Sequence, residues 1–129
     1  MDNKFLVDTS IIIDFLRRKN KSNTILYKYS LKKVVLSISI ITHAELFAGK
    51  SVWSNKVAER ELNKLFSGLT ILPITEAISR NAGKIKVTHG IDLIDSIIAS
   101  TAIQNKLPLL TLNKKHFMQI AGVDLAELN

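Results

Sequence analysis

The sequence predicts an α/β protein with a parallel sheet that is covered by helices on both faces. Two features of the 129 residues point to this class. Short apolar runs rich in Val, Ile and Leu have the length and composition of buried strands. Between them, longer segments place apolar residues at helical spacing, and strands separated by helices favour parallel pairing. A chain of this length is expected to form a single domain over residues 1–129.

The expected strands are residues 5–7, 34–38, 70–72 and 109–111, with a last extended piece at 123–125. The expected helices are residues 10–18, 22–32, 41–48, 55–67, 76–88, 92–106 and 114–120. In the third helix, Ile41, Ala44 and Ala48 share one face, which we expect to be packed, and Gly49 is expected to end the helix. Functional crevices in such sheets lie beyond the carboxyl ends of the strands, where Asp8 falls.

Composition excludes several classes of protein. Lys and Arg number 18 against 11 Asp and Glu, and the net charge of +7 favours an anionic partner such as nucleic acid. The absence of cysteine excludes disulfides, thiol catalysis and cysteine-bound zinc. No apolar run reaches the roughly 18 residues of a membrane span, and the amino terminus does not resemble an export signal. We therefore expect a cytoplasmic protein with no membrane partner.

Three carboxylates occupy positions where an ionised group is energetically unfavourable. Asp8 ends an apolar strand, and Glu45 and Asp95 each belong to a helical stripe of otherwise small apolar residues. A carboxylate in an apolar layer needs a partner or a metal ion. Oxygen ligands of this kind suit Mg²⁺ or Mn²⁺.

Each of these acids also has a purely structural interpretation. Asp8 could cap the helix that follows it, and Glu45 could pair with a lysine across the fold. Asp92 and Asp95 have the spacing of a helix cap and an acid in the first turn. Helix capping explains Asp92. It does not explain why Asp95 lies on a helical stripe that is otherwise apolar.

Four segments occur in an order and at a spacing that resemble the PIN domain family. They are Leu-Val-Asp-Thr-Ser at 6–10, Ala-Glu-Leu-Phe-Ala-Gly at 44–49, Asp-Ser-Ile-Ile-Ala-Ser-Thr-Ala at 95–102 and Leu-Thr-Leu-Asn-Lys-Lys-His-Phe at 110–117. The compact length is similar to that of VapC-type toxins of prokaryotic toxin–antitoxin pairs. The resemblance implies a three-layer α/β/α sandwich around a parallel sheet of about four to five strands. It also implies a metal-dependent endoribonuclease.

Transferred by position, the resemblance assigns Asp8, Glu45 and Asp95 as the acidic cluster that binds Mg²⁺ or Mn²⁺. Asn113 falls at the fourth catalytic position, where many relatives have aspartate and others asparagine. Asparagine adds no charge, so the number of metal ions, one or two, stays open. A bound divalent ion would activate water for attack on phosphorus and offset charge in the transition state.

Other residues are assigned supporting roles. Thr9 and Thr111 match hydroxyl residues that support the site by hydrogen bonding, and Asp92 is interpreted as a cap rather than a ligand. The histidines lack the spacing of a zinc site, and His116 is interpreted as a packing or hydrogen-bonding residue.

RNA contact is expected from basic residues near the crevice, namely Arg17, Arg18, Lys114 and Lys115. The two arginines could equally be solvated cations at a helix end, where they suit the dipole. The resemblance further implies a small cognate antitoxin as partner and a homodimer.

Three other classes of protein share some of these features. A PIN-like module that binds RNA or protein with weak or lost catalysis stays open because of Asn113. An RNA-processing nuclease that is not a toxin also stays open, as does the identity of the RNA. A phosphoacceptor receiver domain is disfavoured, because it needs adjacent acids after its first strand and Asp8 stands alone.

Overall fold

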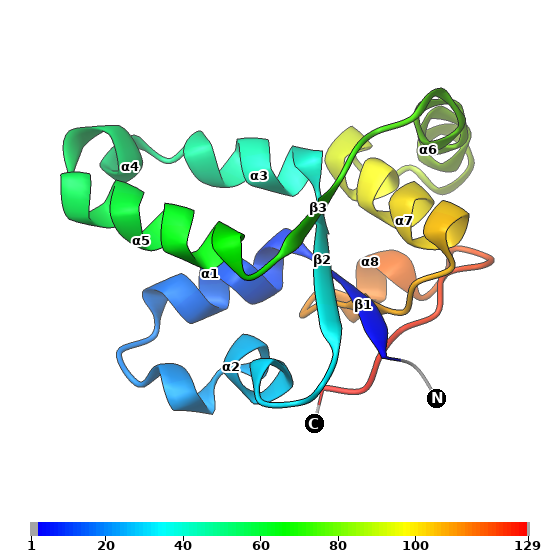
Figure 1. Ribbon diagram of the computed structural model, residues 1–129. Helices are drawn as coiled ribbons and strands as arrows, with labels where there is room; N and C mark the ends of the chain where they lie inside the picture. Colours follow the sequence, from blue (N-terminus) through cyan, green and yellow to red (C-terminus); the bar gives the residue numbers. More distant parts are fainter. Residues whose placement is uncertain (1–2, 129) are drawn as a thin grey trace.

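The computed structural model describes residues 3–128 and has a four-stranded parallel sheet at its centre (Figure 1). The strands are β1 (Lys4–Val7), β2 (Val35–Ser39), β3 (Thr70–Leu72) and β4 (Leu109–Leu110). Their order in the sheet is β3-β2-β1-β4, and every neighbouring pair is parallel. The predicted fold class is confirmed, and β1 lies inside the sheet with its carboxyl end beside that of β4.

Eight α-helices connect these strands in the described part of the chain. They are α1 (Thr9–Arg17), α2 (Ile25–Ser30), α3 (Ile40–Phe47), α4 (Lys50–Ser54), α5 (Lys56–Ser67), α6 (Glu76–His89), α7 (Leu93–Asn105) and α8 (Lys114–Phe117). A 3₁₀ turn, η1, covers Lys21–Asn23. The helices predicted at 10–18, 55–67, 76–88 and 92–106 are each found within one residue of their predicted ends.

The alternation of side chains along β1 defines the three layers. Phe5 and Val7 pack into a core formed with α1, α2 and α5, whereas Leu6 points to the opposite core. That second core contains Ile98 of α7 and Phe117 of α8. Both faces of the sheet are therefore covered, as in the helix groups on either side of the strands in Figure 1. A strand buried on both faces explains why residues 5–7 are uniformly apolar.

The helix predicted at 22–32 is wrong in its first part. Thr24 has an extended backbone, with φ −89° and ψ 153°, so a helix cannot continue through it. Its hydroxyl instead accepts the N–H of Tyr27 at 3.3 Å and caps α2. The preceding residues form η1, which leaves α2 with only the segment from Ile25 to Ser30.

The segment around Gly49 differs from the prediction in two ways. Gly49 does not simply end a helix, because it occupies the N-cap position of the unpredicted α4. The packed face predicted for α3 is wrong for two of its three residues: Ile41 packs against the second core, but Ala44 and Ala48 are exposed. The residues that α3 buries are Thr42 and Leu46. Alanine is small enough that exposing it costs little, so its spacing alone does not identify a buried face.

The last strand and the last helix of the chain are both shorter than predicted. Strand β4 has two residues instead of three, and α8 ends at Phe117. The extended piece predicted near Leu125 is present as a single parallel bridge to Leu109. Within residues 3–128, no helix has the length and apolar character that crossing a membrane requires.

Candidate active site

Asp8 is buried at the point where β1 ends and α1 begins. Its side chain is 2% exposed. Its backbone carbonyl accepts the N–H of Ile11 at 3.1 Å, as expected of an N-cap residue, but its carboxylate makes no capping bond. The carboxylate atom Oδ2 instead accepts hydrogen bonds from the hydroxyls of Ser10 and Thr111, both at 2.7 Å. The capping interpretation of the Asp8 side chain is therefore not supported.

The same two hydroxyls tie Asp8 to the loop that follows β4. Ser10 Oγ accepts the N–H of Leu112 at 3.1 Å, and Thr111 Oγ1 accepts the N–H of Asn113 at 2.9 Å. Each hydroxyl thus accepts from the backbone while donating to the carboxylate, which is a cooperative arrangement. Ser10 is a site residue that the sequence interpretation missed. Its position two residues after an aspartate is the signal that was available, because such serines often bond back to the acid.

Glu45 is connected to this end of the sheet by Thr9. The hydroxyl of Thr9 donates to Glu45 Oε1 at 2.7 Å and lies 3.0 Å from the hydroxyl of Thr42. Because Thr9 directly follows Asp8, the contact holds the two acids on neighbouring elements. The suggested ion pair between Glu45 and a lysine is not present among residues 3–128.

Two further acids stand at the start of α7. Asp92 caps this helix as predicted, since its Oδ1 accepts the N–H of Asp95 at 2.8 Å. Asp95 lies in the first turn with its side chain 17% exposed. The ring atom Nδ1 of His116, on α8, lies 3.2 Å from Asp95 Oδ2, in agreement with a hydrogen-bonding role for this histidine.

Electrostatic interactions show that three of the acids share one region. Burial raises the pKa of Asp95, and the negative charges of Asp92 and Asp8 raise it further, against the opposing contact with His116. No lysine or arginine of residues 3–128 forms an ion pair with any of these three aspartates. The positive ends of α1 and α7 are the compensating charges that the fold provides.

The side chains fit a hard divalent cation in donor type and in charge. They supply carboxylate oxygens. The pKa of Asp95 is raised first by burial and then by the negative charges of Asp92 and Asp8, and a cation would neutralise those charges. Over residues 3–128, no three acidic or histidine side chains are grouped closely enough to enclose an ion. Mg²⁺ retains several waters and is usually held by one or two carboxylates, so this spacing suits a water-rich site.

The remaining predicted residues lie around this acidic region. Asn113 is exposed at the N-cap position of α8 and its side chain makes no capping bond. The four basic residues predicted to contact RNA are all exposed: Arg17, Arg18, Lys114 and Lys115. Of these, Arg18 forms an ion pair, in which its Nε lies 3.1 Å from Asp14 Oδ1.

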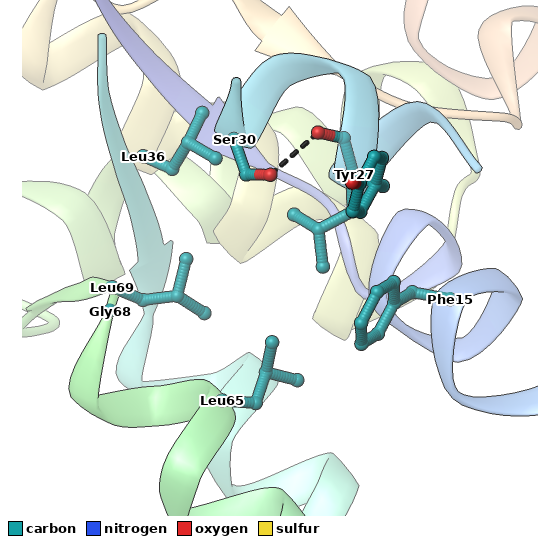
Figure 2. Close-up of a pocket in the computed structure, with 8 residues that line it drawn as sticks. Phe15, Tyr27, Ser30, Leu36, Leu65, Gly68 and Leu69 are labelled. Carbon is teal, nitrogen blue, oxygen red and sulfur yellow. Dashed lines mark hydrogen bonds between the residues drawn. The ribbon is translucent and has the colours of Figure 1, made fainter. Parts of the chain in front are cut away.

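A separate hollow lies between α1, α2, β2 and α5 (Figure 2). Its walls are mainly apolar and include Phe15, Leu36, Leu65 and Leu69, while the Ser30 hydroxyl is bonded to the backbone carbonyl of Tyr27. No carboxylate, imidazole or cation lines it. The groups capable of acid–base or metal chemistry are therefore at the strand ends and not in this hollow.

Comparison with known proteins agrees with the site. A family model of the PIN domain matches residues 5–123. Ribonuclease VapC10 of Mycobacterium tuberculosis is 36% identical over 118 residues, which cover 87% of this chain and 84% of the relative. Ribonuclease VapC19 of the same organism is 34% identical over 120 residues, covering 87% and 90%. The solved structure of VapBC-1 from nontypeable Haemophilus influenzae has a TM-score of 0.78 at 27% identity, covering 97% and 98%.

The fold, the order of the acidic segments and the family match define the chain as a member of the PIN domain family. Within that family it is similar to the VapC ribonucleases along most of its length. The resemblance inferred from the four sequence segments is thereby confirmed.

Proposed function

We propose that the protein is an endoribonuclease that depends on Mg²⁺ or Mn²⁺ and acts as the toxin of a VapBC-type toxin–antitoxin pair. The observation that carries this proposal is the buried Asp8 carboxylate, which lies at the end of β1 near two other aspartates and has no cationic partner among residues 3–128. Relatives with 34% and 36% identity are named ribonucleases, which supports the reaction class.

Asp8, Glu45 and Asp95 are the residues that would hold the metal ion, sharing it partly through its bound waters, because the three side chains are not grouped closely enough in residues 3–128 to enclose it directly. When bound, a divalent ion lowers the pKa of water and offsets negative charge that develops on the phosphodiester. Asp92 is occupied as the cap of α7 through one oxygen and is assigned a supporting role.

The protein's own contribution is to fix the orientation of these carboxylates. Ser10 and Thr111 bind one oxygen of Asp8 from two sides. Thr9 holds Oε1 of Glu45, and His116 contacts Oδ2 of Asp95. Such outer contacts set ligand orientation and are worth about 10–100-fold in metal affinity or activity. Asn113 is placed at the rim of the site by its backbone bond to Thr111.

The partner of this toxin would be a small cognate antitoxin, and the toxin itself would form a homodimer in the cytoplasm, where its RNA substrates are found. A solved structure with a TM-score of 0.77 and 26% identity to this chain is named a toxin–antitoxin complex from Klebsiella pneumoniae, which supports a protein partner of this kind. The net charge of +7 supports binding to an anionic substrate.

The reaction is tested by incubating total RNA with the protein in Mn²⁺, in Mg²⁺ and in EDTA. Asp8→Asn keeps the size and hydrogen-bonding shape of the side chain and removes its charge. We expect cleavage to stop in EDTA and to fall at least about 100-fold in this variant. Glu76→Gln, which changes an exposed acid at the start of α6, is the matched control and should cleave normally. Cleavage that persists in EDTA or in Asp8→Asn would refute the assignment.

The toxin role is tested separately by induced expression in cells. Wild-type protein is expected to arrest growth, whereas Asp8→Asn should not, and co-expression of the antitoxin should restore growth. RNA cleavage in vitro without growth arrest would favour an RNA-processing nuclease. RNA binding without cleavage would favour the alternative of a PIN-like binding module.

A further inference from the structure

A second feature of the site is a hollow between the carboxyl-terminal half of α1 and the loop after β4. It is lined by Ser10, Ile13, Asp14, Arg17, Arg18 and Leu112, and we call it the arginine hollow. It begins at the acidic region, because Ser10 donates directly to Asp8 Oδ2. It ends at the two arginines, so it leads away from the proposed cleavage point toward positive charge.

The two arginines of the hollow are not equivalent. Arg18 Nε lies 3.1 Å from Asp14 Oδ1, so its charge is matched by an acid one helical turn away. The guanidinium of Arg17 forms neither an ion pair nor a hydrogen bond with any residue of 3–128, and Arg17 is exposed. Arg17 is consequently the cation of this hollow that can accept a new anionic partner without first breaking a contact.

Arg17 is also placed to act near the acids. Seven residues of helix separate it from Ser10, a rise of about 10 Å at 1.5 Å per residue. Side chains of a helix lean toward its amino terminus, so Arg17 leans back along α1 toward Asp8. Ile13 and Arg17 also line a second hollow, which contains Glu45. Arg17 thus lines both the arginine hollow, which contains the Asp8 partner Ser10, and the hollow that contains Glu45.

We infer that Arg17, and not Arg18, binds a backbone phosphate of the RNA strand beside the cleavage point. The inference rests on the proposed ribonuclease activity. A guanidinium binds phosphate through two parallel charge-assisted hydrogen bonds, and the phosphate is the anionic group that every RNA nucleotide carries whatever its base. The arginine hollow therefore receives the substrate strand, with Arg17 at the end away from Asp8.

The test compares Arg17→Gln with Arg18→Gln, since the two side chains are neighbours on one helix and both are exposed. Cleavage kinetics are measured in Mn²⁺. Affinity for a labelled, mixed-sequence, single-stranded oligoribonucleotide is measured by fluorescence anisotropy in EDTA over a range of salt concentrations. Arg17→Lys is included because it keeps the charge and removes the paired geometry of the guanidinium.

We expect Arg17→Gln to raise KM about tenfold and to leave kcat nearly unchanged, because a contact to a phosphate other than the one that reacts is made equally in ground and transition states. The slope of log affinity against log salt should decrease by about 0.7, the value for one lost phosphate contact on a single strand. Arg17→Lys should recover the slope but not all of the KM. Arg80→Gln, which changes an exposed arginine of α6 outside the hollow, is the matched control and should change neither quantity. Arg18→Gln should have a smaller effect than Arg17→Gln, because the charge of Arg18 is already matched by Asp14.

The outcomes separate this inference from the proposed function. If the wild-type protein cleaves RNA and Arg17→Gln binds RNA as well as Arg18→Gln does, the inference is wrong while the ribonuclease activity stands. If wild type does not cleave, the proposed function fails and the salt slopes alone decide whether Arg17 binds phosphate. If Arg17→Gln weakens only the binding of the antitoxin, the hollow receives a protein segment and the inference is overturned.

Discussion

Replacing Thr111 by valine isolates the hydrogen bond that holds the buried Asp8. Valine keeps the branched shape of threonine and removes only the hydroxyl. Thr111 is 1% exposed, and its hydroxyl donates to Asp8 Oδ2 at 2.7 Å. The change therefore deprives a buried carboxylate of one of its two donors and deprives the Asn113 N–H of its acceptor.

The size of the effect follows from these contacts. A hydrogen bond to a charged group contributes about 1.5–3 kcal/mol. Asn113 is exposed, so its N–H can bond to water and adds little to the loss. Ser10 continues to donate to the same carboxylate oxygen, which limits the loss of stability. We expect the free energy of unfolding to fall by about 2 kcal/mol. Cleavage should fall by about 10–100-fold because Asp8 is less well oriented.

Stability is measured by urea unfolding followed by circular dichroism, in EDTA so that metal binding does not contribute. Thr101→Val is the matched control, because Thr101 is also buried and its hydroxyl donates to the neutral carbonyl of Ile97 at 2.7 Å. That variant should lose about 1 kcal/mol and cleave RNA normally. Equal losses of stability in the two variants would show that the charge of Asp8 does not strengthen its hydrogen bond.

Two further predictions concern stability. The pKa of Asp95 is raised in the folded protein, so ionisation of this carboxyl opposes folding. The destabilisation is absent below the ordinary pKa of 3.8 and grows as the pH rises through the raised pKa. Asp95→Asn should therefore stabilise the metal-free protein at neutral pH but not below about pH 3.8 in urea unfolding; destabilisation at neutral pH would contradict this. Lys106 ends α7 with a left-handed φ of 55°, so Lys106→Gly should stabilise the protein by about 1 kcal/mol. Gly90→Ala, at a φ of 69°, should lower the free energy of unfolding in the same assay. If both substitutions changed stability in the same direction, the cost assigned to a left-handed backbone at a non-glycine residue would be refuted.

Elements whose signals are local could be predicted from the sequence. The apolar run that forms β1 and the capping aspartate of α7 depend on neighbouring residues alone. The start of α2 is also marked locally, because the hydroxyl of Thr24 accepts the N–H of Tyr27, and this signal was missed; α4 was not predicted. The prediction of the buried face of α3 failed in part, because Ala44 is compatible with either side of a helix.

The acids of the candidate site could be proposed from the sequence, whereas the contacts that hold them could not. Asp8 and Asp95 were chosen as carboxylates beside apolar residues; Glu45 was chosen on a stripe with Ala44 and Ala48, which are exposed in the structure. The bond between Asp8 and Thr111 depends on the register of two strands, in which Val7 lies opposite Leu110. That register is a property of the assembled sheet, so the partners of Asp8 appear only in the structure.

The bridge between Leu109 and Leu125 has a consequence for the solution behaviour of the protein. Leu109 donates to the carbonyl of Asp124 at 2.7 Å and accepts the N–H of Ala126 at 2.9 Å, so the outer edge of β4 is already paired. At the opposite edge, β3 has only three residues and Pro73 follows it. Unpaired edges recruit strands from other molecules and start aggregates. Proteolytic removal of the tail would therefore leave the N–H and the carbonyl of Leu109 unpaired at this edge and favour pairing with a strand of another molecule.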